Sequence, residues 1–493
     1  MKSDIEDREL SRLGDIDPQV FRTFGYRIID WVADYLEHPE KYPVLANVVP
    51  GEIRSQLPAV PPEQPEPMST IVDDVERIIV PGLTHWNHPA FMAYFGTSGS
   101  VPGILGELLC SAFNVNAMLW KTSPAATELE EVALDWLRQM IGLPAGFSGI
   151  IYDTASVSTL HAVAAAREAV PGLNSRELGL SGRSDAPRLR LYASEQAHSS
   201  VEKAAITLGI GQAGFRKIPV DSEFRMVPEA LQQAVEDDRK VGWTPFCAVA
   251  TVGTTSTTSV DPVPAIADIC RKHSIWLHVD AAYGGAAATI PEMRWIMEGC
   301  DRADSLVVNP HKWIFTPMDL SAFYTQRMNV LKQAFSLVPE YLKTGQDASV
   351  RNMMDYGVQL GRRFRALKLW MIIRTYGRSG IEARIREHMR LARMFASWVE
   401  EDPAFELLAP VPFSTICFRA LPTGNSDDGD RLNDALLSAV NATGEVFLSH
   451  TRLHNKFTIR MAIGNIRTDE KVVRRAWELL KANLDRLRGE NSR

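Results

Sequence analysis

The sequence predicts an α/β protein built around a mostly parallel sheet. Between about residues 125 and 374, short β-branched strands alternate with helical segments, the pattern of a parallel sheet covered by helices. At 493 residues the chain is too long for one ordinary domain, so we expect two or three lobes. The clearest predicted strands are 149–152, 189–193, 247–252, 275–280 and 305–309.

The first 90 residues are predicted to be an appended helical segment. Asp17 and Pro18 make a good helix start, and apolar residues then recur at helical spacing over 20–36. A stiff, proline-rich linker at 58–67 separates this helix from a second amphipathic helix at 71–79. The apolar stripe of the first helix needs a covering surface, either its own domain or a partner subunit.

The pattern changes again after the predicted sheet. Residues 361–376 are predicted to form a long helix that ends at Gly377. A small α+β region follows, with apolar runs at 415–418 and 457–461 and a last helix from about Thr468. The predicted units are 1–90, a large domain at 91–377 and a small C-terminal domain at 378–493.

Composition and charge exclude several classes of protein. The net charge of −7 argues against nucleic acid as the main partner. None of the five cysteines form a C-x-x-C pair, so we expect reduced thiols in a cytoplasmic protein and no metal site. Residues 1–15 lack the apolar region of a secretory signal. The most apolar stretch, 98–119, contains Pro102 and Glu107, and we expect it to be buried or to line a cleft, with no membrane partner.

Two strand ends carry a candidate catalytic pair. Lys312 follows an apolar strand within the motif NPHKW (309–313), and Asp280 ends a strand within HVDAAYGG (278–285). Ligands bind at the carboxyl ends of strands in such sheets. A buried lysine becomes nucleophilic, although most lysines are surface charges. A buried carboxylate needs a partner, either an arginine or a cationic pyridine nitrogen. Lysine for a Schiff base and aspartate for that nitrogen are what pyridoxal 5′-phosphate (PLP) requires.

Three further residues could contact the cofactor ring. His198 follows the predicted strand at 189–193 and could stack on the ring, although a single histidine is more often a packing or capping residue. Ala282 is small enough to let the ring lie flat on the opposite side. Thr255, in a polar run after the strand at 247–252, could reach the ring's phenolic oxygen or belong to an ordinary loop.

A phosphate site is predicted where the strand at 149–152 leads into a helix. Thr154, Ala155 and Ser156 would offer free N–H groups and hydroxyls at a helix start. On this segment alone, an ordinary helix cap is the simpler interpretation. Asn309 and His311 could complete the site.

Taken together, these residues resemble the group II PLP-dependent decarboxylases, most closely the aromatic-L-amino-acid decarboxylases. The resemblance covers nearly the whole chain and includes DWVADYL (30–36), SPAATELE (123–130), QAHSSVE (196–202) and GRRFR (361–365). It implies PLP fold type I with a seven-stranded central sheet. It also implies a homodimer with the active site at the subunit interface and the first helices wrapped around the partner.

The resemblance also implies a role for each matched residue. Lys312 would form the Schiff base, Asp280 would hold the pyridine nitrogen, and His198 would stack on the ring. The motif PEYLK (339–343) matches a mobile catalytic loop in which Tyr341 donates a proton. The oxidative branch of the family, which makes aldehydes, typically has phenylalanine or asparagine in place of this tyrosine and histidine. Tyr341 and His198 therefore predict a true decarboxylase.

The predicted substrate is an aromatic L-amino acid, with tryptophan the first choice and tyrosine, dopa and phenylalanine open. Gly361 matches a residue that accompanies indole preference in plant relatives. An acidic substrate is disfavoured because no extra arginine occupies a matched pocket position. An aldehyde synthase, another fold type I enzyme such as an aminotransferase, and an inactive dimeric scaffold are the alternatives. The predicted pocket residues are Trp86, Tyr94, Phe95, Gly96, Thr97, Asn116, Met118 and Gly361.

Overall fold

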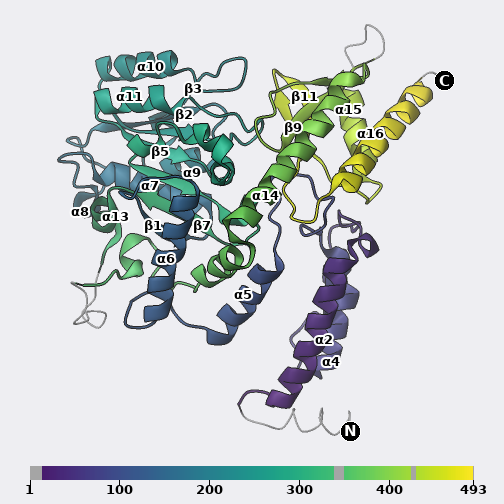
Figure 1. Cartoon of the computed structure of the whole chain (residues 1–493). Helices are drawn as coiled ribbons and strands as arrows, with labels where there is room; N and C mark the ends of the chain where they lie inside the picture. Colours follow the sequence, from purple (N-terminus) through teal and green to yellow (C-terminus); the bar gives the residue numbers. More distant parts are fainter. Residues whose placement is uncertain (1–13, 338–348, 423–428, 492–493) are drawn as a thin grey trace.

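The computed structural model describes residues 14–337, 349–422 and 429–491 (Figure 1). The strands are β1 (Ser148–Tyr152), β2 (Arg188–Ser194), β3 (Phe215–Ile218), β4 (Trp243–Thr251), β5 (Trp276–Asp280), β6 (Ser305–Val308), β7 (Ser321–Thr325), β8 (Phe405–Leu407), β9 (Thr415–Ala420), β10 (Ser449–Leu453) and β11 (Lys456–Ala462). The α-helices are α2 (Pro18–Glu37), α3 (Glu52–Gln56), α4 (Met68–Asp74), α5 (Val101–Phe113), α6 (Pro124–Met140), α7 (Ala155–Glu168), α8 (Ser175–Leu178), α9 (Ser200–Thr207), α10 (Pro228–Lys240), α11 (Val263–His273), α12 (Pro310–Trp313), α13 (Met328–Phe335), α14 (Ala366–Glu401), α15 (Gly429–Asn441) and α16 (Glu470–Asn491).

The central sheet has seven strands in the order β1-β7-β6-β5-β4-β2-β3. Strand β7 runs antiparallel to both of its neighbours, and the other adjacent pairs are parallel. The predicted mostly parallel sheet is therefore confirmed, and the five strands predicted individually correspond to β1, β2, β4, β5 and β6. Strand β3 escaped the prediction because it has only four residues, two of them the cations Arg216 and Lys217.

Helices cover both faces of this sheet. Along β4, Ala248 and Ala250 belong to one apolar core, and the alternate residues Cys247 and Val249 belong to the other. Helices α10 and α11 close the first face, and α7, backed by α9 and α13, closes the second. A strand that is buried on both faces has no polar side, which explains why these strands read as continuous apolar runs in the sequence.

The predicted N-terminal helix is confirmed as α2. The carboxylate of Asp17 accepts a hydrogen bond from the backbone N–H of Gln19 at 2.8 Å and caps the helix. Figure 1 shows α2 and α4 side by side, projecting from the rest of the protein. Val20 is the only buried residue of α2, and Phe21 and Tyr26 are each 65% exposed. The described part of the chain therefore covers the apolar stripe of this helix only in part.

The C-terminal region forms a second, four-stranded sheet in the order β10-β11-β9-β8. It packs with α15, α16 and the second half of α14, and its core also includes the segment 90–93. The prediction of a helix over 361–376 is wrong at its start. The helix starts only at Ala366, because the backbone of Arg362 pairs instead with Asn116 and Ala117. Its predicted end is confirmed: Gly377, at φ 62°, is non-helical and divides α14 into two helical parts, the second of which continues to Glu401.

The apolar stretch 98–119, which we expected to be buried or to line a cleft, contains α5. This helix is buried on one side only. Pro102, Gly106 and Cys110 are buried, whereas Leu108 and Phe113 are about half exposed. No helix in the described ranges is long and apolar enough to cross a membrane. All five cysteines are buried and free of disulfides.

Candidate active site

Strand pairing brings the predicted catalytic pair to one edge of the sheet. Strands β5 and β6 are parallel, with Asp280 opposite Val307. The two loops that follow are joined by a hydrogen bond from the backbone N–H of Asn309 to the carbonyl of Ala282, at 3.0 Å. The short helix α12 then carries Lys312 as its third residue. Asp280 and Lys312 therefore approach each other from adjacent strand ends.

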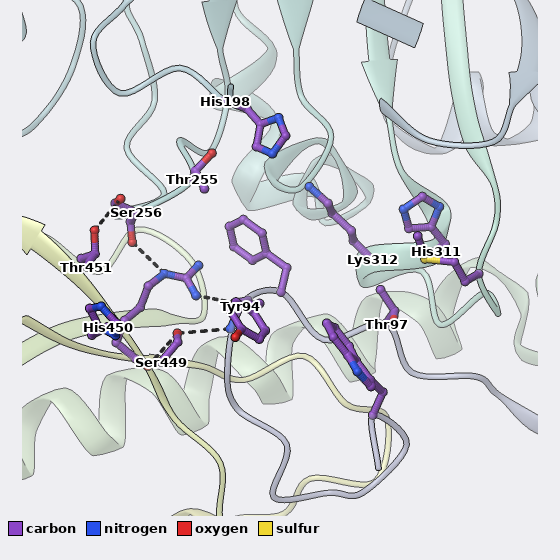
Figure 2. Close-up of a pocket in the computed structure, with 14 residues that line it drawn as sticks. Tyr94, Thr97, His198, Thr255, Ser256, His311, Lys312, Ser449, His450 and Thr451 are labelled. Atoms are coloured by element: carbon purple, nitrogen blue, oxygen red, sulfur yellow. Dashed lines mark hydrogen bonds between the residues drawn. The ribbon is translucent and has the colours of Figure 1, made fainter. Parts of the chain in front are cut away.

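Lys312 points into a cavity of about 710 Å³ (Figure 2). Its Nζ lies 4.9 Å from the centre of the Phe95 ring. Burial lowers the pKa of this amine, the charge of Asp280 opposes that shift, and Arg460 adds to it. A lysine with a lowered pKa supplies more of the neutral amine that attacks a carbonyl.

Asp280 is 5% exposed. Its Oδ1 accepts a hydrogen bond from the backbone N–H of Ala282 at 3.0 Å. No arginine or lysine of the described residues forms an ion pair with this carboxylate, so the structural alternative of an arginine partner finds no support here. Ala282 is itself 5% exposed.

His198 lies in the turn between β2 and α9 and lines the same cavity. Its Nδ1 accepts a hydrogen bond from the backbone N–H of Ser200 at 3.2 Å, so the proton of the neutral ring resides on Nε2. Burial is the main cause that lowers the pKa of this imidazole, and Lys312 contributes to the lowering. The ring is therefore neutral at pH 7 and offers an Nε2–H donor.

The predicted phosphate residues occupy two neighbouring segments. Thr154 is the N-cap of α7, and Ala155 and Ser156 begin the helix. None of these three is among the described residues that line the cavity. One turn along α7, the hydroxyl of Ser158 lies 2.8 Å from that of Ser321. Ser321 follows the segment that hydrogen bonds to His311, so the start of α7 and His311 lie on adjoining elements.

Asn309 and His311 form a buried pair, 2% and 3% exposed. His311 Nδ1 accepts the backbone N–H of Leu320 at 3.0 Å, and burial is the main cause that lowers the pKa of this ring to about 3. Its proton is therefore on Nε2, which faces the Asn309 amide at 3.3 Å. That N–H needs an acceptor, so the network assigns the amide oxygen to this side. The amide NH₂ then takes the buried position that has no partner within the described ranges, where it could donate to an anion.

The predicted substrate pocket is divided between two places on the chain. Trp86, Tyr94, Phe95 and Thr97 line the cavity with Lys312, together with Thr255. Gly96 lies within the same segment, against the backbone of Gly464 and Asn465. Asn116, Met118 and Gly361 form a separate cluster, in which Asn116 Nδ2 is 3.4 Å from Met118 Sδ. In the described part of the chain, the cavity lining includes none of these three.

Six residues that line the cavity were missed in the sequence: Ser256, Met318, Ser449, His450, Thr451 and Arg460. Four of them come from β10 and β11 of the small sheet, which only the tertiary fold brings to this edge. Arg460 lies outside the pocket positions matched to the family, so the statement that no extra arginine occupies those positions did not consider it. The signal that could have revealed it is a cation inside the apolar run 457–461.

Arg460, in β11, forms hydrogen bonds to two other segments of the cavity wall. It is 4% exposed, its Nε donates to the Ser256 carbonyl at 2.9 Å, and its Nη1 donates to the Tyr94 carbonyl. The guanidinium lies 4.5 Å from the centre of the Phe95 ring. Its Nη2 is buried and has no hydrogen-bond partner among the described residues. Tyr341, the predicted proton donor, lies outside the described residues.

Comparison with known proteins identifies the family. The model of the "pyridoxal-dependent decarboxylase conserved domain" matches residues 50–421. The chain belongs to this family. It is 40% identical over 486 residues to tryptophan decarboxylase 2 of Oryza sativa subsp. japonica, covering 96% of each chain. It is also 40% identical over 477 residues to phenylacetaldehyde synthase of Arabidopsis thaliana, covering 94% of this chain and 96% of the relative.

Solved structures agree with this assignment. The crystal structure of Oryza sativa TDC with PLP and tryptamine superposes with a TM-score of 0.93 at 36% identity, covering 97% of this chain and 100% of that one. The predicted fold type I is thereby confirmed, as is the resemblance to group II decarboxylases. The protein is a PLP-dependent carboxy-lyase.

The site fits this cofactor on its own chemistry. The Lys312 amine lines the cavity, and its pKa is lowered. The buried Asp280 carboxylate forms no ion pair with a described side chain. The Asn309 amide has a buried atom without a hydrogen-bond partner among the described residues. An aldehyde, a pyridinium and a phosphate would satisfy these three groups in turn.

Proposed function

We propose that this decarboxylase acts on an aromatic L-amino acid and releases the arylethylamine and carbon dioxide. The observation that carries the proposal is that the Lys312 amine shares its cavity with an aromatic wall. Trp86 stacks on Phe91 and Tyr94, with ring centres 4.2 and 5.8 Å apart, so the aromatic rings of this wall support one another. Tryptophan is the first choice of substrate, and tyrosine, dopa and phenylalanine are the others.

Each residue at the reacting centre has a proposed role. Lys312 would anchor the cofactor through its amine, and Asp280 would keep the pyridine nitrogen protonated. The bound cofactor would supply a sink for the electron pair released when the carboxylate leaves as carbon dioxide. His198 and Ala282 would hold the ring between them, and Thr255 would hydrogen bond to its phenolic oxygen. Closure of the cavity excludes water from the reacting carbon.

The phosphate would be held by two sets of donors. Thr154, Ala155 and Ser156 offer the N–H groups and hydroxyls at the start of α7, and the Asn309 amide donates from the loop after β6. His311 orients that amide through its Nε2–H. Its pKa of about 3 keeps the ring neutral at pH 7, so the tautomer that orients the amide persists.

Arg460 is the proposed ligand of the substrate carboxylate. Two of its nitrogens are held by backbone carbonyls, so the unpartnered Nη2 has a fixed position. A guanidinium N–H forms a charge-assisted hydrogen bond with a carboxylate. We propose that this contact fixes the orientation of the bond that breaks.

Proton delivery distinguishes amine from aldehyde production. We propose that Tyr341 protonates the substrate Cα, assisted by the Nε2–H of His198. The equal identity to a decarboxylase and to an aldehyde synthase does not separate these reactions. The presence of both residues favours the decarboxylase, and an oxidative aldehyde synthase is the second candidate.

We also propose a homodimer with the active site at the subunit interface. Two features support it: α2 and α5 expose large apolar side chains, and the cluster of Asn116, Met118 and Gly361 is separate from the cavity of its own chain. In a dimer this cluster would complete the partner's aromatic pocket. Asn116 would then offer a polar contact to an indole N–H or a ring hydroxyl.

Complementation between two inactive variants tests the shared site. Lys312→Ala removes the anchoring amine, and Met118→Arg blocks the pocket that Met118 completes. If Met118 acts in the partner's site, mixed dimers contain one intact site, and random mixing of equal amounts restores about a quarter of wild-type activity. Mixtures that stay inactive, although mass spectrometry shows mixed dimers, would contradict a shared site.

The remaining expectations concern organisation and location. We propose that 1–90, 91–377 and 378–493 are the three structural units, with 90–93 packing on the last of them. A cytoplasmic location is proposed because the five cysteines are free and buried.

A substrate panel tests the proposed function. The full-length protein is purified with PLP and given L-tryptophan, L-tyrosine, L-dopa, L-phenylalanine and L-glutamate. Carbon dioxide, amine, keto acid and peroxide are measured together. Amine and carbon dioxide in equal amounts, from an aromatic substrate only, are expected. Peroxide with aldehyde would instead establish the oxidative reaction, and a keto acid would establish an aminotransferase.

A further inference from the structure

Arg365 joins two loops of the large domain just before α14. Its side chain is 9% exposed, and its Nη2 lies 2.5 Å from Asp153 Oδ1. The same guanidinium contacts both carboxylate oxygens of Asp319, with Nε to Oδ1 and Nη2 to Oδ2 each at 3.2 Å. One planar cation therefore bridges two carboxylates from segments far apart in the sequence.

Each carboxylate adjoins one half of the proposed phosphate site. Asp153 immediately precedes Thr154, the N-cap of α7. Asp319 immediately precedes Leu320, whose backbone N–H donates to His311 Nδ1 at 3.0 Å. Arg365 thus lies where the start of α7 meets the loop that supports His311 and, through it, the Asn309 amide.

Asp319 is held ionised by its neighbours in this cluster. Burial acts to raise the pKa of Asp319, but the hydrogen bond and charge of Arg365, with the charge of Lys368, lower it below its ordinary value. Lys368 Nζ is 3.8 Å from Asp319 and also pairs with Glu107. A guanidinium can bridge two carboxylates with a fixed planar geometry, whereas a lysine ammonium acts as a point charge.

We propose that Arg365 is a positioning residue for cofactor phosphate binding. It sets the separation between the start of α7 and the His311 loop, so that donors from both reach one phosphate group. The inference rests on the proposed phosphate site. It makes a selective claim: loss of Arg365 weakens binding of PLP, but not of pyridoxal, which has the same aldehyde and ring and lacks the phosphate.

The test measures the dissociation constants of PLP and pyridoxal for the full-length protein stripped of cofactor. Binding is followed by the absorbance of the Schiff base with Lys312. Arg365→Gln is expected to weaken PLP binding about 10- to 100-fold, by analogy with metal sites that lose a residue orienting one of the metal ligands. Arg365→Lys should recover only a small part of this loss. Pyridoxal binding should change by less than about twofold, because the Lys312 and Asp280 contacts persist.

Two further variants keep the test decisive. Asp319→Asn removes one of the bridged charges with little change of shape, and it should weaken PLP binding selectively even if Arg365→Gln does not fold. Arg378→Gln is the control. Arg378 lies further along α14, its side chain is 49% exposed, and its Nε pairs with Glu382 Oε1 at 2.7 Å. This control should bind both compounds as the wild type does.

Two outcomes would overturn the inference without touching the proposed reaction. Equal weakening of PLP and pyridoxal would show that Arg365 only supports the fold, and unchanged PLP binding would show that it has no such role. If the wild-type protein itself bound PLP no more tightly than pyridoxal, and inorganic phosphate did not compete with PLP, the proposed phosphate site would be wrong as well.

Discussion

Replacing Asp280 by asparagine removes the charge that we propose faces the cofactor, and it should leave the local fold intact. The asparagine oxygen can still accept the hydrogen bond from the Ala282 N–H, which Asp280 Oδ1 accepts at 3.0 Å. The side chain has almost the same shape, so the thermal midpoint should change little. The change therefore isolates electrostatics.

The expected loss follows from Coulomb's law. Asp280 is 5% exposed, and two opposite charges about 4 Å apart interact by about 4 kcal/mol at an effective dielectric constant near 20. Each 1.36 kcal/mol of barrier changes a rate about tenfold. Asp280→Asn should therefore lower the rate of carbon dioxide release by roughly 10³-fold.

The assay is single-turnover carbon dioxide release by variant that has been saturated with PLP. Saturation is verified from the Schiff-base absorbance, so that weak cofactor binding is not mistaken for slow chemistry. Asp280→Glu, which retains the charge but displaces it, should be intermediate. A variant that is fully loaded, folded and slowed by less than tenfold would refute the role given to this carboxylate.

Two other changes test the proton donor and the buried histidines. With dissolved dioxygen as the oxidant and water supplying the carbonyl oxygen, Tyr341→Phe should divert product from amine to aldehyde, ammonia and hydrogen peroxide. A variant that still makes only amine in aerated buffer would exclude Tyr341 as the donor. Burial lowers the pKa of His161, His278 and His388 to about 4. The unfolded chain takes up their protons near pH 6.5 and the folded chain does not, so stability is complete above pH 6.5 and falls as the pH is lowered, by up to about 1.4 kcal/mol per pH unit for each histidine. Burial raises the pKa of Asp261 to about 6 and acts in the opposite sense. The difference between the urea midpoints at pH 7.5 and 5.5 measures the combined effect of these groups on stability. Equal midpoints would contradict a net effect of the histidines.

The sequence predicted the site best where function depends on strand ends. Strands β5 and β6 are buried throughout, so their ends at Asp280 and Asn309 were visible as polar residues after runs that are apolar apart from His278 and Ser305. Lys312 follows by three residues, and strand pairing required only that the two strands be neighbours. The local sequence was therefore enough to predict where these groups lie relative to the edge of the sheet.

Prediction was weaker where backbone pairing with a distant segment replaces a local pattern. Residues 361–365 have helical periodicity, yet Arg362 gives its N–H to the Asn116 side chain and its carbonyl to the Ala117 N–H. These tertiary hydrogen bonds outweigh the small free energy of extending a helix by one turn.

By itself, the sequence determined the α/β class and the cofactor chemistry, and it predicted the residues that would carry this chemistry, because each prediction depends on a side-chain type at a fixed distance from a strand. Only the tertiary structure decided how the cavity is walled. It brought Arg460 and the edge strand β10 from the small sheet to the cofactor edge, and it placed Asn116, Met118 and Gly361 in a separate cluster. Contacts of this kind join segments hundreds of residues apart, and no periodicity within either segment encodes them.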